Sequence, residues 1–138
     1  VSTGWRVRCT SGVTPGRHWG VTSLLLYTDE QCSQEHLLNS LAGSQPLESG
    51  HCCSRESSGA ENALLPGRQR GHGWRSQGSG EAASGHFLGL QLPASAAAGV
   101  RCVRLEQEES SRTSGPCHRW SLEYKTEDDR PSGRWAAA

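Results

Sequence analysis

The chain has 138 residues, of which 33% are hydrophobic, and its formal net charge at pH 7 is zero. This length fits one domain, and the neutral balance excludes the broad basic surface that draws a protein to nucleic acid or anionic lipid. No stretch approaches the ~20 consecutive apolar residues that span a bilayer, so we expect no direct membrane span. Because the hydrophobic content is low, we expect the apolar residues to be concentrated in a few strands.

The first half of the chain predicts two strands and a long irregular region. Apolar side chains over residues 5–9 alternate with arginines, which is the two-residue period of a half-buried strand. A turn follows over residues 10–18, and residues 19–28 form the strongest apolar run, rich in residues that favour strands. Leucines within residues 34–41 favour one short helix, whereas residues 42–85 are rich in Gly, Ser and Arg and predict mostly loop.

Within this loop, we expect ordered structure at residues 62–65 and at Trp74. The chain then returns to strands at residues 88–92, 103–105 and 120–124, each with apolar side chains on one face.

Several short strands joined by turns, with almost no helix signal, predict an all-β fold. We expect an antiparallel β-sandwich with long loops and at most one short helix. The prediction is one domain over residues 1–138, with a core over about 5–126 and a tail over 127–138.

The six cysteines are an even set in a short chain with a thin core, which predicts disulfides formed in an oxidising compartment. The sequence does not choose among their connectivities; the preferred pairs are Cys9 with Cys102, and Cys32 with either Cys52 or Cys53. The chain begins at Val1, which fits the removal of a signal or transit peptide, so we expect an extracellular or organelle-lumen location. The candidate disulfide cysteines are Cys9, Cys32, Cys52, Cys53, Cys102 and Cys117.

Five short motifs occur along the chain in a characteristic order. They are a Trp-x-Val-x-x-Leu-x-Leu-Tyr strand at 19–27, an Asn-Ala turn at 62–63 followed by Trp74, and strand segments at 88–90, 100–105 and 120–124. This order resembles a discoidin-like domain, the coagulation factor 5/8 C-type, galactose-binding-like β-sandwich. The resemblance implies a domain that grips ligands with its loops and performs no chemistry.

The sequence departs from this family at the position where calcium-binding members carry an Asp. Leu65 and Pro66 stand there, and neither supplies the hard oxygen ligand that calcium prefers. We therefore expect the family's calcium and sugar site to be lost. The long loops are rich in Ser, Gly and Arg and lack the aromatic or leucine spikes of members that enter membranes.

A basic cluster with one aromatic residue is the candidate partner-binding loop. Such a cluster can grip a carboxylate, a sulfated glycan or an acidic protein face. The alternative is that the tryptophan packs in the core while the arginines are solvated. The members are Arg68, Arg70, His72, Trp74 and Arg75.

Motifs for catalysis and metal binding are weak. His51, Cys52 and Cys53 with the Cys117-His118 pair offer soft ligands, but adjacent cysteines rarely bind one zinc ion together. The sequence has no Gly-x-Ser-x-Gly elbow, phosphate loop or His-Glu-x-x-His motif. We expect no enzyme activity, no metal and no cofactor.

The expected function is therefore that of a non-catalytic binding module. The first hypothesis is a structural accessory subunit or extrinsic domain that docks on protein partners in a larger assembly. The alternative is a secreted glycan- or ligand-recognition module of lectin-like or adhesion type. Ile and Met are absent, a bias that with these motifs resembles dinoflagellate sequences and implies a third role, a lumenal extrinsic subunit of an organelle membrane complex such as a dinoflagellate photosystem.

Overall fold

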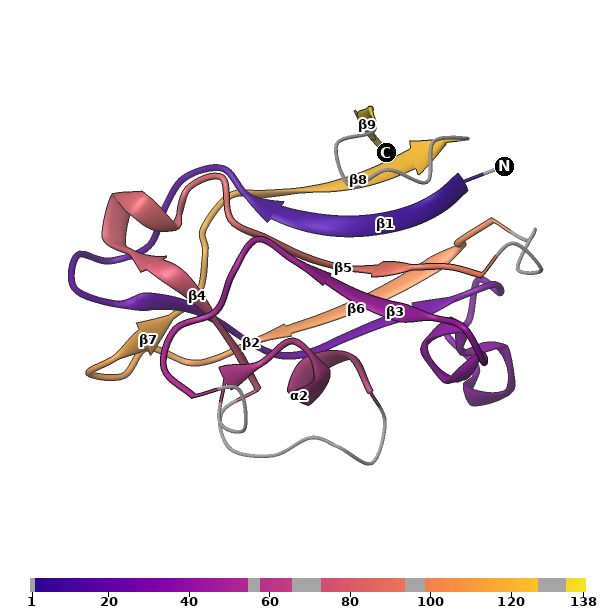
Figure 1. The fold of residues 1–138 in the computed structure, drawn as a ribbon, viewed down its shortest axis with the longest axis horizontal. Helices are drawn as coiled ribbons and strands as arrows, with labels where there is room; N and C mark the ends of the chain where they lie inside the picture. The colour runs from indigo at the N-terminus through magenta and orange to yellow at the C-terminus, as the bar shows by residue number, and fades with distance from the viewer. Residues whose placement is uncertain (1, 55–57, 66–72, 94–98, 127–133) are drawn as a thin grey trace.

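The computed structural model describes residues 2–54, 58–65, 73–93, 99–126 and 134–138. These residues form two mainly antiparallel β-sheets whose inner faces share one hydrophobic core (Figure 1). The predicted all-β, sandwich-like fold is confirmed. No helix in this part of the chain is long and apolar enough to cross a membrane.

The larger sheet has five strands in the order β3-β5-β1-β8-β9. The central strand is β1, which pairs antiparallel with β5 on one side and β8 on the other. The short strands β3 and β9 form the two edges. The bounds are β1 Ser2–Cys9, β3 Gln45–Glu48, β5 Phe87–Gln91, β8 Trp120–Thr126 and β9 Trp135–Ala137.

The smaller sheet is built on β2 (His18–Tyr27), which pairs antiparallel with β4 (Trp74–Ser79) and with β6 (Cys102–Gln107). The two-residue strand β7 (Ser114–Gly115) adds a parallel contact to the start of β2. In Figure 1, β9, β8 and β1 lie at the top of the molecule and β2 lies towards the bottom.

In the described residues, the connections between strands include the short helical segments η1, η2, α2 and η3. The single helix predicted within 34–41 is instead a pair of 3-10 turns, η1 (Gln34–His36) and η2 (Leu38–Ser40). The α-helix α2 (Glu61–Leu64) forms where the sequence predicted an ordered segment at 62–65 inside the long loop. The 3-10 turn η3 (Gly80–Ala83) follows β4. That loop is more regular than predicted, because it also contains β3 and the whole of β4.

An irregularity in β2 explains the spacing of its core residues. Trp19 and Val21 face the core at the usual two-residue step, but the next core residues are Leu24 and Leu26. The pairing with β6 shifts register between Val21 and Ser23, so the alternation moves by one residue at this bulge. The bulge therefore keeps four apolar side chains of one strand on the same buried face.

Asn39 ties the helical segments to the smaller sheet. Its side chain is buried, and its Oδ1 accepts a hydrogen bond from the Leu26 N–H at 2.9 Å. Its Nδ2 donates to the carbonyl oxygens of Leu24 at 3.0 Å and Leu64 at 2.7 Å. One side chain thus joins η2, β2 and the end of α2, and a buried amide with these three bonds is well satisfied.

All six cysteines are in disulfides, but the predicted pairing of Cys9 with Cys102 is wrong. Cys9 ends β1, whose neighbours are β5 and β8, whereas Cys102 begins β6 in the other sheet. Cys9 instead bonds to Cys117, just before β8, with a Cα–Cα distance of 5.9 Å. Cys9 and Cys117 can therefore bond because β1 and β8 are neighbours in the larger sheet.

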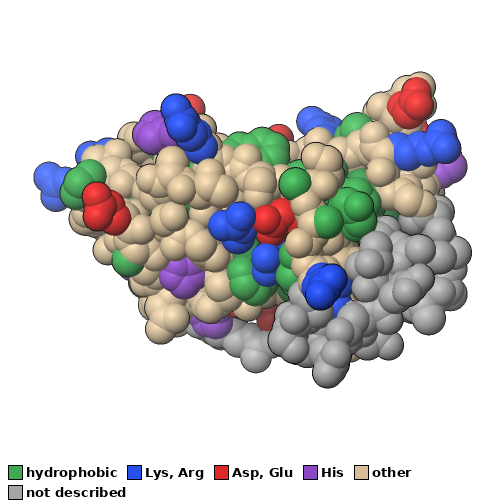
Figure 2. Space-filling view, turned by 90° about the horizontal axis from the view of Figure 1, so that it is seen from above, with side chains coloured by type: hydrophobic (Ala, Val, Ile, Leu, Met, Phe, Trp, Pro, Cys, Tyr) green, Lys and Arg blue, Asp and Glu red, His purple; other side chains and the backbone are tan. Residues whose placement is uncertain are grey.

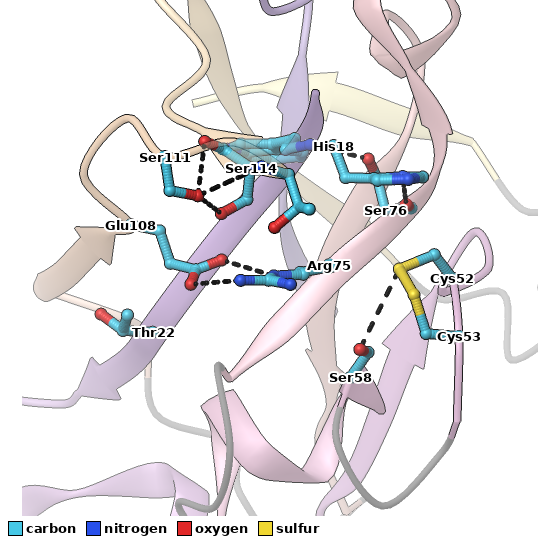
Figure 3. Close-up of polar contacts among 12 residues, drawn as sticks. His18, Thr22, Cys52, Cys53, Ser58, Arg75, Ser76, Glu108, Ser111 and Ser114 are labelled. Atoms are coloured by element: carbon cyan, nitrogen blue, oxygen red, sulfur yellow. Dashed lines mark hydrogen bonds and ion pairs between the residues drawn. A yellow bond between two sulfur atoms is a disulfide. The ribbon is translucent and has the colours of Figure 1, made fainter. Parts of the chain in front are cut away.

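The predicted pairing of Cys32 with Cys52 or Cys53 is also wrong. Cys102 pairs in register with Tyr27 at the end of β2, and the segment after Tyr27 returns Cys32 to it with a Cα–Cα distance of 5.4 Å. Cys52 and Cys53 bond to each other. This adjacent pair lies between β3 and α2, and Figure 3 shows it facing Ser58.

Candidate functional site

Of the predicted basic loop, Arg68, Arg70 and His72 lie outside the residues that the structure describes. The other two members begin β4 and point to opposite sides of the sheet. Trp74 is fully buried, its ring meets that of Trp19 edge-on at 5.2 Å between centroids, and its indole N–H donates to Glu48. Trp74 is therefore a core residue.

Arg75 lies on the outer face of the smaller sheet and is held there by Glu108. Its Nε and one terminal nitrogen donate to the two Glu108 carboxylate oxygens at 3.0 and 3.1 Å, which is a bidentate pair (Figure 3). Both side chains are only slightly exposed, at 11% and 12%. The pair crosses over Gly20 of β2, where a Cβ would overlap the Glu108 carboxylate. The missing side chain at Gly20 therefore makes room for this ion pair.

The polar groups beside this pair are engaged in structural hydrogen bonds. Figure 3 shows the His18 ring directed at Ser76, and its Nδ1 lies 2.7 Å from the Ser76 carbonyl oxygen. The Ser76 hydroxyl accepts from the Trp19 N–H at 3.0 Å and donates to the Gly78 carbonyl at 2.7 Å. These contacts join β2 and β4, and they use the Ser76 hydroxyl as both an acceptor and a donor.

Ser49 and His86 form a close pair that looks like a nucleophile with its base. The His86 Nδ1 lies 2.6 Å from the Ser49 hydroxyl oxygen. However, the His86 Nε2 accepts a hydrogen bond from the Gly78 N–H at 3.1 Å, so the neutral ring carries its proton on Nδ1 and donates it to Ser49. Burial, followed by the nearby His18, lowers the pKa of His86 and favours this neutral ring. The serine therefore receives a hydrogen bond from the histidine, the reverse of what a general base requires.

A charged cluster occupies the outer face of the larger sheet. Glu123 lies opposite Arg6 in the β1–β8 register, and the Arg6 Nε donates to its carboxylate at 2.7 Å; Arg8 adds a second ion pair at 3.1 Å. The Arg6 guanidinium carbon also lies 4.4 Å from the ring centroid of Phe87 and 4.2 Å from that of Trp135. Two rings and a carboxylate thus fix one guanidinium group.

The environment of Glu123 keeps it ionised. Burial alone would raise the pKa of its carboxyl group, but the hydrogen bonds and positive charges of Arg6 and Arg8 outweigh burial and hold the pKa below its usual value. Figure 2, seen from the side of β9 and β8, shows acidic and basic side chains next to hydrophobic ones near the middle of this face.

A shallow hollow lies on the same face. Its volume is about 220 Å³, and its polar and apolar walls come from both edges of the sheet. Gly4 of β1 has no side chain to fill it, and a Cβ there would lie 3.3 Å from the Trp135 ring. The lining residues are Gln45, Leu47, Glu48, Phe87, Gln91, Lys125 and Trp135.

An incompletely covered apolar surface runs along β8. We call it the β8 stripe: Trp120, Leu122 and Tyr124 at alternate positions of the strand, with Trp5 of β1 against Tyr124 at 5.4 Å between ring centroids. Their register places them on the face that carries buried Val7 and Cys9, yet all four are at least partly exposed. Trp120 is 41% exposed and, with Leu41, is one of two exposed large hydrophobic residues in the described part of the chain. The alternating pattern predicted this strand, but it did not predict that its apolar face is only partly covered.

Comparisons with protein-family models, with curated proteins and with solved structures found no match for this chain. The resemblance to discoidin-like domains therefore stays a prediction from the sequence motifs.

Proposed function

We propose that the chain is a non-catalytic interaction module that docks on a larger protein through the β8 stripe. The observation that carries this proposal is the exposure of Trp120, at 41%, at one end of a row of partly buried apolar side chains. Tryptophan is enriched among the residues that dominate protein–protein binding energy. The commitment of the Ser49 and Ser76 hydroxyls to structural hydrogen bonds supports a binding role over catalysis.

The energy available at Trp120 is of the size expected for an interface anchor. A tryptophan side chain buries 150–250 Å², so an exposure of 41% leaves roughly 60–100 Å² to be covered. At about 25 cal/mol per Å², covering this area contributes roughly 1.5–2.5 kcal/mol. His118 and Arg119, both exposed, precede this residue. A partner with an apolar contact surface and an acidic group at its rim fits this arrangement.

The test is native co-purification with a matched pair of variants. The chain is isolated gently from the cells that make it, and proteins that elute with it are identified by mass spectrometry. We expect a stoichiometric partner that Trp120→Ser loses and Leu41→Ser retains, because Leu41 is equally exposed but lies after η2. Thermal melts establish that both variants are folded. A folded wild-type chain that elutes alone would refute the docking role.

The hollow on the outer face favours a second candidate function, the recognition of a small neutral ligand such as one sugar ring of a glycan. Its volume of about 220 Å³ is below the 300–1,000 Å³ of typical drug-sized sites, and its wall combines aromatic and amide groups. The Glu48 carboxylate already accepts from Trp74 and contacts His51, so a neutral ligand fits better than a cation.

Nuclear magnetic resonance titration with neutral monosaccharides, together with a glycan array with and without calcium, tests this second function. Gly4→Val should fill the hollow and abolish binding, whereas Gly99→Val should not, because no atom of the described residues lies within 4 Å of a Cβ at that glycine. Binding that survives Gly4→Val would place the ligand elsewhere, and no binding to either probe set would refute this function.

A further inference from the structure

The adjacent disulfide Cys52–Cys53 contributes little to holding the fold together. In the chain-entropy model, a disulfide stabilises a protein by closing a loop of the unfolded chain, and the stabilisation grows with the length of that loop. The other two disulfides join residues 108 and 70 positions apart, whereas Cys52 and Cys53 are 1 position apart. The two long-range bonds therefore fasten the sandwich, and the adjacent bond can open without releasing it.

The adjacent bond is also the one that a reagent in solution reaches most easily. Of the six cysteines, all of which the structure describes, Cys53 alone is exposed. Cys9 and Cys117 are buried, and the two cysteines of the third bond are half-buried. Thiol–disulfide exchange begins when a thiolate attacks one sulfur of a disulfide, so its rate depends on access to that sulfur. Access therefore favours attack at Cys53.

The backbone at Cys53 favours opening of the bond. Its φ of 66° lies in the left-handed region, which residues other than glycine seldom adopt. Opening the bond frees Cys53 to return to ordinary backbone angles. Cys32 also has a left-handed backbone, with φ of 54°, but it is half-buried and its partner Cys102 is fixed in β6. Exposure and a left-handed backbone thus coincide only at Cys53, and exposed or strained disulfides are the labile ones.

Hydrogen bonds that do not involve the sulfurs hold the chain on both sides of this pair. Before it, the Cys52 N–H donates to the Arg75 carbonyl of β4 at 3.0 Å. After it, the Ser58 N–H donates to the Ser54 carbonyl at 2.9 Å. These contacts keep the two cysteines close together after reduction, so the bond can form again in the folded chain.

The two sulfurs have different surroundings. Cys52 is buried, and its Sγ lies 4.0 Å from the hydroxyl oxygen of buried Ser58 (Figure 3). Burial in apolar surroundings raises the pKa of a thiol, whereas a solvated thiol forms its thiolate more readily. Cys53 is therefore the sulfur that meets a reagent, and Cys52 is the sulfur that leaves on reduction and closes the bond on reoxidation.

From these features we infer that Cys52–Cys53 is a thiol–disulfide exchange site that takes electrons from external dithiols and returns them to external disulfides while the sandwich stays folded. One thiolate of the dithiol attacks the Cys53 sulfur, the S–S bond breaks, and its electron pair leaves on Cys52. The second thiolate of the dithiol then attacks its own sulfur in the mixed disulfide and displaces the Cys53 thiolate. The cysteines gain two electrons and the two protons that the dithiol loses, and the dithiol becomes a disulfide. This site is separate from the proposed docking surface and does not depend on it.

The experiment follows reduction of the full folded chain by dithiothreitol at neutral pH without denaturant. Samples are quenched with N-ethylmaleimide, and labelled peptides are quantified by mass spectrometry. We expect Cys52 and Cys53 to be labelled at least about tenfold faster than the four other cysteines. The reduced chain should lose under about 5 °C in Tm. Oxidised glutathione should then close the bond again without denaturant.

Two single variants test the roles of the two sulfurs. Cys52→Ser leaves the exposed Cys53 thiol, and Cys53→Ser leaves the buried Cys52 thiol. We expect N-ethylmaleimide to label the first variant at least about tenfold faster than the second. In the double variant Cys52→Ala with Cys53→Ala, the fast phase of reduction should be absent and the slow labelling of the other cysteines should remain.

Three results would overturn the inference. The first is reduction of all three disulfides at one rate, or of a long-range bond first, because the adjacent pair would then not be selected. The second is reduction only together with loss of the folded circular-dichroism spectrum. The third is an opened pair that oxidised glutathione does not close in the folded chain. Equal labelling of the two single variants would refute the assignment of Cys53 as the attacked sulfur. A failure to co-purify a partner would refute the docking function and leave this inference standing.

Discussion

Removal of the Cys9–Cys117 disulfide should destabilise the fold far more than removal of Cys52–Cys53. The first bond joins residues 108 positions apart and the second joins neighbours. In the chain-entropy model, the corresponding stabilisations are about 4.8 and about 0.6 kcal/mol at 25 °C. Cys9 and Cys117 are also both buried, so replacing them by alanine adds a packing loss of about 1 kcal/mol per site.

The assay is urea unfolding of two double variants, Cys9→Ala with Cys117→Ala and Cys52→Ala with Cys53→Ala, followed by tryptophan fluorescence at 25 °C. The free energy of unfolding comes from linear extrapolation. Thiol titration verifies that the two remaining disulfides have formed in each variant. We expect a loss of at least about 4 kcal/mol for the first variant and under about 1 kcal/mol for the second.

A third variant without Cys32–Cys102, whose cysteines are 70 positions apart, should lose about 4.4 kcal/mol. It tests whether stabilisation follows loop length or the identity of one bond. Equal losses for the adjacent pair and the two long-range pairs would refute the argument from loop closure.

Variants at three sites test individual ionisable groups. Glu108→Gln should cost about 2–4 kcal/mol in urea unfolding, because it leaves the nearly buried Arg75 without a charged partner, and the double change Arg75→Met with Glu108→Leu should recover most of this loss; a double variant as unstable as the single one would contradict it. The pKa of His86 is below its ordinary 6.5, so its contribution to stability should be complete above that pH and lost as the pH falls towards the folded pKa; His86→Gln should flatten the dependence of Tm on pH there, and an unchanged slope would count against it. The pKa of Glu123 is below its ordinary 4.5, so Glu123 should contribute stability above that pH and lose it at more acid pH; Glu123→Gln should lower Tm at pH 7 and reduce the acid slope below about 4.5, and an unaltered Tm would show that its pairs with Arg6 and Arg8 contribute nothing.

Strands with a clear two-residue alternation could be predicted from the sequence. The alternation over 5–9, the apolar run at 19–28 and the leucines at 88–92 each correspond to a strand, because burial of one face imposes that pattern. β3 and β9 were missed: they are short edge strands, one containing Pro46, and their pairing depends on neighbours distant in the sequence.

Disulfide connectivity and the surroundings of the candidate site could not be predicted, because both depend on strand order. Cys9 meets Cys117 only because β1 lies beside β8, and Arg75 meets Glu108 only because both elements flank β2. Nothing local in a loop-like stretch of Gly, Ser and Arg signals that one arginine is buried against a carboxylate. The exposure of Trp120 could not be predicted for the same reason. Its alternation with Leu122 predicts a buried face, and strand order decides how much of that face is covered.

Because β1 lies at the centre of the larger sheet, it can be completed only after two later strands, β5 and β8, have been synthesised. Trp5 pairs with Leu90 on one side and with Tyr124 on the other, so neither partner exists when β1 leaves the ribosome. At about 5–20 residues per second, roughly 6–24 s separate the synthesis of Trp5 from that of Tyr124. Throughout this interval the apolar side of β1, with Val7 and Cys9, lacks the strand that completes its surroundings. Among the strands of the described residues, β1 thus waits longest during synthesis for its second neighbour.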